Sequence, residues 1–347
     1  MTTYPQDLQT LLLESIERAE EALDRMKAEL TKVTKKSDEA FDLNAYIHDN
    51  PTALNLWDIW CHHLLERYCE EAAETCDAYM NTDKETDTLR HSLTPEDLQQ
   101  QKNHHRDYLR HLLSSPFPSS PEQAVGFQRG KRLFLEGWPV NLMLKYFQFE
   151  WQTLQRVLPN TSWEHQGLRT LITDRLIKGL HLQWQAYQEM ESFRWTLVEN
   201  ALAISHPSFK PLHVPTMIRE RLGHLCQKEQ LLGIVLMDYR NNDPKGQVLA
   251  GDFPQVPSEI VDITALIHRI RNQGQPLILN GLLPYQDTSS AFPSRAVRSL
   301  GIWTLPSHGA LGSPALLVYS LWPGYFINEK TQKFWHMLSL ILSHYVF

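Results

Sequence analysis

The first forty residues place apolar side chains at alternating steps of four and three, with charged residues between them. The positions that follow this rhythm are Leu12, Ile16, Ala19, Leu23, Met26, Leu30 and Val33. This spacing is typical of a helix that pairs with another helix in a coiled coil. We therefore expect residues 1–40 to form a helix that makes a homodimer, and the residues expected at the dimer seam are Leu12, Ile16, Leu23, Met26 and Leu30. The alternative is that the same seam packs on the rest of its own chain.

Between residues 41 and 204 the apolar positions keep a helical spacing but form wider stripes. Such stripes predict buried helices over residues 57–79 and 163–204. Thr94 is expected to cap a further helix, because the proline and two acidic residues after it suit a first helical turn. The proline-rich run at residues 114–121 is expected to end that helix. The sequence thus predicts an all-α domain over residues 41–204.

After residue 205 the pattern changes to short apolar runs separated by turn residues. The strand-like runs are residues 231–239, 247–253, 276–280, 299–305 and 314–321, and helical stretches are expected at 258–271 and 328–345. Strands that follow one another with few helices between them favour an antiparallel sheet. We therefore predict a second domain over residues 205–347, of the α+β class, with its helices on one side of an antiparallel sheet.

Length and charge narrow the classes of protein that fit this organisation. The chain has 347 residues, which exceeds the usual length of one domain. A formal net charge of -7 leaves no broad basic face, so we expect no nucleic-acid partner. No apolar run reaches the roughly 20 residues needed to cross a bilayer, and residues 1–7 lack the start of a secretory signal. These features predict a cytoplasmic protein without membrane insertion.

A set of motifs in the helical region points to a known family. A helix centred on Tyr68 and the helix start at Thr94 are followed by a Gly-x-x-x-x-x-x-Gly-x-Pro segment at 130–139 and an aromatic helix at 146–151. In these features residues 55–203 resemble the globin domain of globin-coupled sensors, which are bacterial signalling proteins. The resemblance implies an all-α globin-like fold and a place in signal transduction.

The same resemblance also indicates that the haem ligand is missing. In the family, the residue three after the first glycine is the proximal histidine, and here it is Leu133. An axial haem ligand must be His, Cys, Met or Tyr. The neighbouring residues, Arg132 and Phe134, supply none of these. We therefore expect no haem and no other cofactor.

The family register implies a pocket at the place where a haem would lie. Its lining would be Tyr68, Tyr108, Leu112, Phe127, Leu133, Phe134, Leu142, Tyr146 and Phe147. Protein interiors are densely packed, so a space of that size does not stay empty. Either bulky side chains fill it, which we favour, or a small hydrophobic ligand occupies it.

Histidines near this pocket offer a second kind of chemistry. His104, Tyr108 and His111 recur at steps of four and three, so they share one helix face, with His105 nearby. Neutral imidazole is the commonest metal ligand in proteins, which makes this face a candidate metal site or distal haem site. The alternative, which we favour, is that Tyr108 packs inward and the histidines are exposed. Because the cysteines also lack CxxC spacing, we expect no metal site.

The last part of the chain carries a second, weaker resemblance. Gly274-x-Pro276 precedes one predicted strand, Ser299-Leu300-Gly301 opens the next, and residues 323–326 precede the last helix. With the order of the elements, these motifs make residues 211–347 similar to a GAF domain, which implies a small-molecule or signal-transmission module. Its candidate pocket would be lined by Leu249, Ala250, Gly251, Phe253, Leu300 and Trp303. The residues needed for a bilin or a cyclic nucleotide are not found, so we favour contact with other proteins.

No enzyme signature is present in the sequence. Phosphate loops, serine-hydrolase elbows, zinc-protease and kinase motifs are absent, as are those of cyclic-di-GMP cyclases and phosphodiesterases. We therefore expect no catalysis by this chain. The final helix is apolar up to Phe347, which predicts that the chain is the sensory part of a longer polypeptide.

The two resemblances together predict a sensory and regulatory module of a signalling protein, globin-like but without haem, followed by a GAF domain. In both families this architecture usually precedes an output domain. The module would pass a ligand or partner signal to a downstream catalytic domain of the same polypeptide, a diguanylate cyclase or a cyclic-di-GMP phosphodiesterase. One alternative is a haem-binding gas sensor that uses a replacement histidine. Another is a stand-alone protein-interaction scaffold.

Overall fold

The structure is a computed structural model that describes residues 57–82, 86–115, 118, 120–158, 163–204, 214–238, 245–251, 276–282, 297–305 and 314–346. The expected helix at residues 1–40 and its dimer seam lie outside these residues, as do Phe253 and the expected helix at 258–271. The described part consists of helices followed by an antiparallel sheet with helices, which confirms the predicted fold class at this level. All of it belongs to one unit, Leu56–Phe347.

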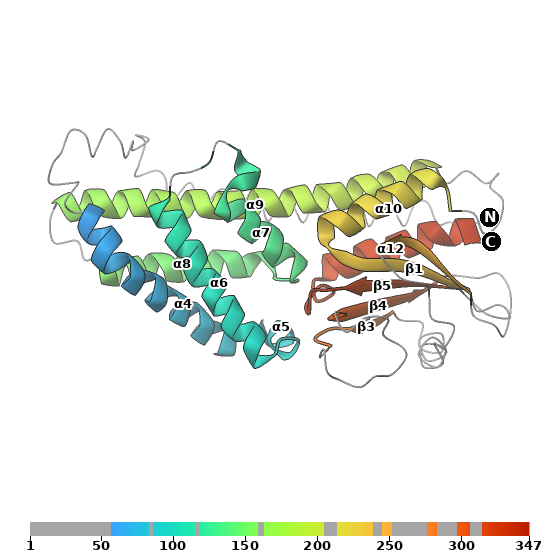
Figure 1. Cartoon of the computed structure of the whole chain (residues 1–347), viewed down its shortest axis with the longest axis horizontal. Coiled ribbons are helices and arrows are strands. Elements are labelled where there is room, and N and C mark those ends of the chain that lie inside the picture. Colours follow the sequence, from blue (N-terminus) through green and yellow to red (C-terminus); the bar gives the residue numbers. More distant parts are fainter. Residues whose placement is uncertain are drawn as a thin grey trace. The chain divides into compact units, whose positions relative to one another are not determined.

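The helical part contains long helices joined by short connections (Figure 1). Its elements are η1 (Trp60–Leu64), α4 (Leu65–Thr82), α5 (Asp87–His91), α6 (Pro95–Ser114), η3 (Pro121–Gln123), α7 (Val125–Leu135), α8 (Val140–Val157) and α9 (Trp163–Ile204). Helix α4 packs on α6 and α8, and α9 packs on α6, α7 and α8. The apolar stripes seen in the sequence form this core, in which Tyr68, Leu109 and Ile172 are fully buried.

Helix α6 begins where the sequence predicts. Thr94 has an extended backbone, and its side-chain oxygen accepts a hydrogen bond from the backbone N–H of Asp97 at 3.1 Å. The Asp97 carboxylate accepts in return from the backbone N–H of Thr94 at 2.8 Å. This reciprocal arrangement is a capping box, and it satisfies donors that the first helical turn leaves free. The position of Asp97 is thereby fixed by the start of the helix.

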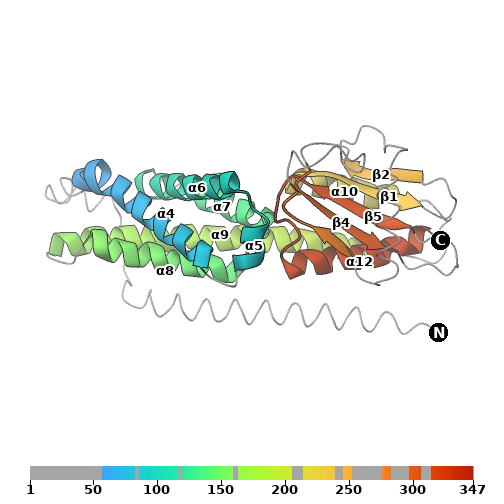
Figure 2. The same cartoon turned by 90° about the horizontal axis from the view of Figure 1, so that it is seen from below.

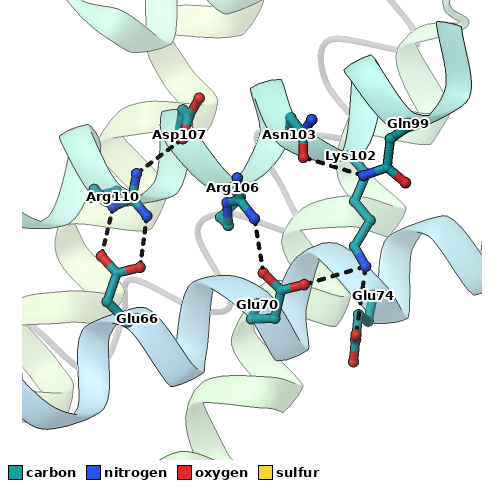
Figure 3. Close-up of polar contacts among 9 residues, drawn as sticks. All are labelled: Glu66, Glu70, Glu74, Gln99, Lys102, Asn103, Arg106, Asp107 and Arg110. Atoms are coloured by element: carbon teal, nitrogen blue, oxygen red, sulfur yellow. Dashed lines mark hydrogen bonds and ion pairs between the residues drawn. The ribbon is translucent and has the colours of Figure 1, made fainter. Parts of the chain in front are cut away.

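Charged side chains join the exposed sides of α4 and α6 (Figure 3). Glu66 binds Arg110 through both carboxylate oxygens at 2.6 Å, and Glu70 pairs with Arg106 at 3.2 Å and with Lys102 at 3.3 Å. The partners recur every four residues on two antiparallel helices, so each turn of α4 faces opposite charge on α6. Exposed pairs contribute only about 0–1 kcal/mol each. Their main effect is to hold α6 in one rotation about its axis, with its other face toward the core.

Helices α7 and α9 cross at short range because glycines line the crossing. A Cβ atom on Gly130 would collide with the backbone of Gln183, and one on Gly126 would lie 2.8 Å from the carbonyl oxygen of Gly179. Real side chains do not tolerate such distances, so only glycine fits at these positions. The first glycine of the motif that carries the globin resemblance therefore has a packing role in this structure.

The last part is a five-stranded antiparallel sheet with the order β2-β1-β5-β4-β3. Figure 2 shows β2, β1, β5 and β4 side by side, and Figure 1 shows β3 beside β4. The strands are β1 (Leu231–Asp238), β2 (Lys245–Gly251), β3 (Leu277–Leu279), β4 (Ser299–Thr304) and β5 (Ala315–Ser320). Each strand begins and ends within two residues of the predicted run, and the predicted last helix is also found. Helix α10 (Thr216–Glu229) packs on β1 and β2, and α12 (Glu329–Val346) packs on β4.

The two faces of this sheet have separate cores, because successive residues of a strand point to opposite sides. One face gathers Val235, Met237, Leu300, Ile302, Leu317 and Tyr319. On the other face, the ring of Trp303 contacts Phe326 and the ring of Trp335 from α12. Helix α12 thus covers the face to which Trp303 points.

A buried arginine joins the long helix α9 to the sheet part. The guanidinium of Arg194 donates to both carboxylate oxygens of Glu229 in α10, at 2.6 and 2.8 Å, and to Thr331 Oγ1 in α12 at 2.8 Å. It also donates to the hydroxyl of Tyr325 at 3.1 Å and lies 4.4 Å from the ring centre of Phe134 in α7. Arg194 is 3% exposed and Glu229 is 0% exposed. These five residues, called the Arg194 cluster below, come from α7, α9, α10, the turn before α12 and α12 itself, and they hold these five segments together.

Further contacts between the helical part and the sheet part involve backbone or a paired charge. Asp97 of the α6 cap accepts hydrogen bonds from Arg298, which precedes β4, at 2.6 and 3.2 Å. Gly137, between α7 and α8, has a φ of +80°, and a Cβ atom there would collide with the carbonyl of Gly324. Packing of backbone on backbone leaves little room for relative movement without loss of contact.

Replacing Gly137 tests how closely these backbones are held. We expect Gly137→Ala to lower the free energy of unfolding by at least about 1–3 kcal/mol, because alanine is strained at this φ and meets Gly324. Gly223→Ala is the matched control, since nothing lies within 4 Å of a Cβ atom there. It sits inside α10, where alanine should raise stability by about 0.5–1 kcal/mol. Urea unfolding followed by circular dichroism measures both, and equal effects would contradict the close contact.

Candidate functional site

The most unusual chemistry in the helical core is a buried pair of ionisable side chains. His105 of α6 and Glu150 of α8 meet with 2.8 Å between Nε2 and Oε1, and neither side chain is more than 5% exposed. Tyr146, one turn before Glu150, stacks on the His105 ring with the ring centres 5.2 Å apart and the planes 9° apart. An ionised carboxylate only accepts hydrogen bonds, so opposite an ionised Glu150 the Nε2 atom of His105 carries the hydrogen.

Polar groups from three other helices complete the surroundings of this pair. The hydroxyl of Tyr68 in α4 donates to the backbone carbonyl of Glu150 at 3.1 Å. Gln183 of α9 donates to the hydroxyl of Tyr108 at 2.8 Å. The guanidinium of Arg129 in α7 lies 4.4 Å from the centre of the Tyr108 ring. Five helices therefore contribute to one buried polar network.

Burial sets the charge state of most of these groups. Burial lowers the pKa of His105 to about 4, with help from the positive charge of Arg129 and against the hydrogen bond to Glu150. Burial also raises the pKa of Tyr68, Tyr108 and Tyr146 above that of a free phenol. At neutral pH the imidazole and the phenols are therefore uncharged, and they act as hydrogen-bonding groups.

Two small cavities adjoin the pair. One has a volume of about 10 Å³ and is lined on its polar side by Arg129, Trp138, Glu150 and Gln183. The other, of about 20 Å³, is lined by Asp77, Lys102, His105, Arg129 and Trp138 among others. Arg129, Trp138 and Tyr146 line both cavities and so form the wall between them. Each space is large enough for about one water molecule.

The structure brings together only part of the predicted globin-like pocket. Leu133, Leu142, Tyr146 and Phe147 line the first cavity. Tyr68 and Tyr108 belong to the polar network, and Leu112 packs against Gly179 beside Tyr108. The other two predicted residues lie elsewhere. Phe127 packs with Ala124, Leu182 and Ala186 in a separate cluster, and Phe134 lies edge-on to Tyr187 under Arg194.

Among the histidines of α6, the buried one is His105 rather than the residues on the predicted face. His104 is half-buried and His111 is exposed, while Tyr108 is buried. His105 lies inward because it shares the buried face of α6 with Tyr108, Leu109 and Leu112. In the part of the chain that the structure describes, no group of three or more metal-binding side chains is found.

The residues at this site do not fit a haem in the conformation described. Leu133, where the resemblance to globin-coupled sensors implies an iron ligand, is 5% exposed in the core and has no ligand atom. The Nε2 atom of the buried His105 is already hydrogen-bonded to the carboxylate of Glu150. The two cavities hold about 10 and 20 Å³, far too little for a porphyrin.

The second predicted pocket, on the sheet, is divided by the pleat of its strands. Leu300 lies in the core on one face, whereas Trp303 packs against α12 on the other. Leu249, Ala250 and Gly251 lie in β2, where the pairing with β1 shifts register and Ala250 faces Ile234. Phe253 lies outside the described residues. The structure does not bring Leu300 and Trp303 into one pocket, because positions three apart on a strand point to opposite sides.

Four residues that line the cavities are not among the site residues predicted from the sequence: Arg129, Trp138, Glu150 and Gln183. A signal for one of them exists. Glu150 follows Tyr146 and precedes Leu154 at steps of four, so an acidic residue sits on the apolar stripe of α8. Charged residues are almost never fully buried unless they are paired, so an acid on such a stripe predicts a buried partner. The other three have no comparable local signature.

Comparisons with known proteins supply no relative for this chain: no family model, no curated protein and no solved structure matches it. A search of the described helices finds none that is both long and apolar enough to cross a membrane.

The low pKa of His105 predicts a loss of stability in mild acid. The unfolded chain binds a proton at the ordinary histidine pKa of 6.5, whereas folded His105 resists it down to about 4. Between these values the unfolded state holds more protons, so stability falls as the pH falls, by up to roughly 3 kcal/mol. The difference in unfolding free energy between wild type and His105→Gln, measured by urea titration at pH 7 and pH 4, should shrink by this amount.

His105→Gln keeps a donor for Glu150 but cannot take up a proton in this range. It also leaves other acid-sensitive groups unchanged, including His336 and Asp97, whose pKa values are lowered as well. A His105 pKa near 6.5, measured by nuclear magnetic resonance of the folded protein, would contradict the assignment.

Proposed function

We propose that this chain is a sensory and regulatory module without haem, in which a globin-like helical part receives a signal and a GAF-like sheet part transmits it. The observation that supports this best is the continuity of α9. Gln183 lines the first cavity, and Arg194 of the same helix is the centre of the Arg194 cluster. These positions are 11 residues apart (194 − 183), or about 16 Å and three turns, so both side chains project from the same face.

This geometry gives a physical route for a signal. A rotation or tilt of α9 that changes the contacts of Gln183 also changes the position of Arg194. Because Glu229 is 0% exposed, its carboxylate loses stabilisation sharply when the guanidinium moves away. A small displacement at the cavity is thereby converted into a change in the placement of α10 and α12.

Helix α6 provides a second, parallel connection. Its first turn holds Asp97, which binds Arg298 beside β4, and its third turn holds His105 in the core. The α6 capping box and the ion pair share the same carboxylate, so α6 cannot shift along its axis without disturbing Arg298. Two helices thus link the His105–Glu150 site with the sheet part.

The proposed output lies in a catalytic domain of the same polypeptide, a diguanylate cyclase or a cyclic-di-GMP phosphodiesterase, as both resemblances imply. The module is proposed to act as a homodimer through the seam of residues 1–40. A coupling free energy of about 1–3 kcal/mol, typical of allosteric proteins, would change the affinity or population of the output state by about 5–150-fold. The tight packing around Arg194 is suited to such a discrete change.

A substitution at the cavity should alter the distant helices if this proposal is right. Gln183→Met keeps the approximate volume of the side chain but removes the hydrogen bond to Tyr108. We expect faster amide hydrogen exchange in α10 and α12 than in wild type, beyond any change explained by the free energy of global unfolding. Exchange measured by mass spectrometry at native pH reports each segment separately.

His181→Gln is the matched control, because His181 lies two residues away on α9 and is exposed. It should leave α10 and α12 unchanged. If the effect of Gln183→Met stays within α6, α8 and the first half of α9, the two parts are not coupled. That outcome would favour a stand-alone scaffold.

A haem titration separates the proposal from the gas-sensor alternative. We expect no stoichiometric Soret band when hemin is added to the purified chain, because Leu133 offers no ligand and the cavities are small. A sharp Soret band that saturates at one equivalent would contradict this. Loss of such a band in His105→Ala, with retention in His111→Ala, would then identify His105 as a replacement ligand.

A further inference from the structure

The wall between the two cavities carries a buried hydrogen-bond donor for which the described residues offer no acceptor. The indole Nε1 of Trp138 is buried and has no hydrogen-bond partner among the described residues, although Trp138 is only 2% exposed. The guanidinium of Arg129 contacts the ring of Tyr108, and within the described part of the chain it makes no ion pair. Both groups line both cavities.

A buried donor without an acceptor is costly. An indole N–H only donates, and leaving it unsatisfied in the interior costs about 1–3 kcal/mol. An apolar occupant would leave this cost in place. Because Trp138 lines both cavities, an occupant that presents an acceptor to its indole would remove this cost.

The charged side chains that line the cavities limit which kind of molecule can occupy them. An anion would suit Arg129 and Trp138 but would face Glu150 in the first cavity and Asp77 in the second. A metal cation would suit these carboxylates but would face Arg129, and Lys102 in the second cavity. A neutral molecule that both accepts and donates satisfies both sets of groups.

The volume of the cavities limits the neutral occupant to a single water molecule in each. The cavities measure about 10 and 20 Å³, which is the space needed for a single water molecule, and water makes two to four hydrogen bonds at such polar sites. We propose that each cavity binds one ordered water, and that these waters accept from Trp138 and Arg129 and donate to the carboxylates. They complete the hydrogen bonding of the network around His105 and Glu150.

The place of Trp138 gives these waters a structural consequence. Its backbone carbonyl accepts a hydrogen bond from the hydroxyl of Tyr187 in α9 at 2.6 Å. The preceding residue, Gly137, is the one that touches Gly324 of the sheet part. Water at the indole therefore positions the turn between α7 and α8, where the helical part meets the sheet part. This inference concerns the occupant of the site and does not depend on signal transmission through α9.

Water at Trp138 can be detected in solution by nuclear magnetic resonance. With ¹⁵N-labelled tryptophan in the full chain, we expect a direct cross-relaxation peak between the Trp138 indole N–H and water. Trp303 is the internal control, because its Nε1 is also buried without a partner among the described residues but lines neither cavity. It should show no such peak. Trp138→Phe and Trp303→Phe assign the two signals by their loss.

A crystal structure of the full chain at about 1.5 Å gives the second readout. Two ordered waters, one on each side of Trp138, support the proposal. Empty cavities, a missing water peak at Trp138 or an equal peak at Trp303 would overturn it. Density for a larger molecule would also overturn it and would identify a ligand instead. The Gln183→Met exchange experiment has an independent outcome, so failure here is distinguishable from failure of the coupling.

Discussion

The buried contact between Arg194 and Glu229 is the interaction on which the arrangement of the described structure depends. A guanidinium and a carboxylate removed from water are stable only when their geometry is good and their remaining groups are bonded. Here the carboxylate is bound through both oxygens, and Thr331 and Tyr325 accept further N–H groups. These partners come from α9, α10, α12 and the turn before α12. None of these elements can move far without leaving a buried charge unpaired.

The surroundings of that contact show that the helical part and the sheet part pack directly against each other. Phe134 of α7 covers the guanidinium, and the turn that follows α7 touches Gly324 through Gly137. The Asp97 carboxylate caps α6 and binds Arg298 at the same time. Residues that serve two elements at once make the position of one element depend on the other, which is the physical requirement for coupling.

The chemistry of the helical core differs from what a globin-like pattern implies. Where the resemblance implies a large apolar pocket, the structure has a buried Leu133 and a polar network around His105 and Glu150, with room for about one water in each of the two cavities that Trp138 lines. Such a network is stable only when nearly every group is satisfied. It therefore specifies the relative placement of the five helices more strictly than an apolar core would.

The sequence by itself determined the kind and extent of most elements, because those depend on local patterns. The capping residues at Thr94, the 42-residue helix α9 and the five strands all follow from spacing and turn chemistry. The site depended on tertiary structure. Whether His104 or His105 is buried depends on the rotation of α6 about its axis. The charge pairs with α4 and the packing of Tyr108 together fix that rotation.

Leu300 and Trp303 are close in sequence, but the pleat of β4 places their side chains on opposite faces of the sheet. In the sequence, Gly130 and Gly137 are two positions of one motif. Only the fold shows that Gly130 allows α7 to approach α9 and that Gly137 contacts Gly324. Arg129 lies in α7, Trp138 in the turn after α7 and Gln183 in α9, and no local pattern records that their side chains converge. Periodicity reports which side of an element is buried. Which buried groups meet is decided by the packing of one element on another.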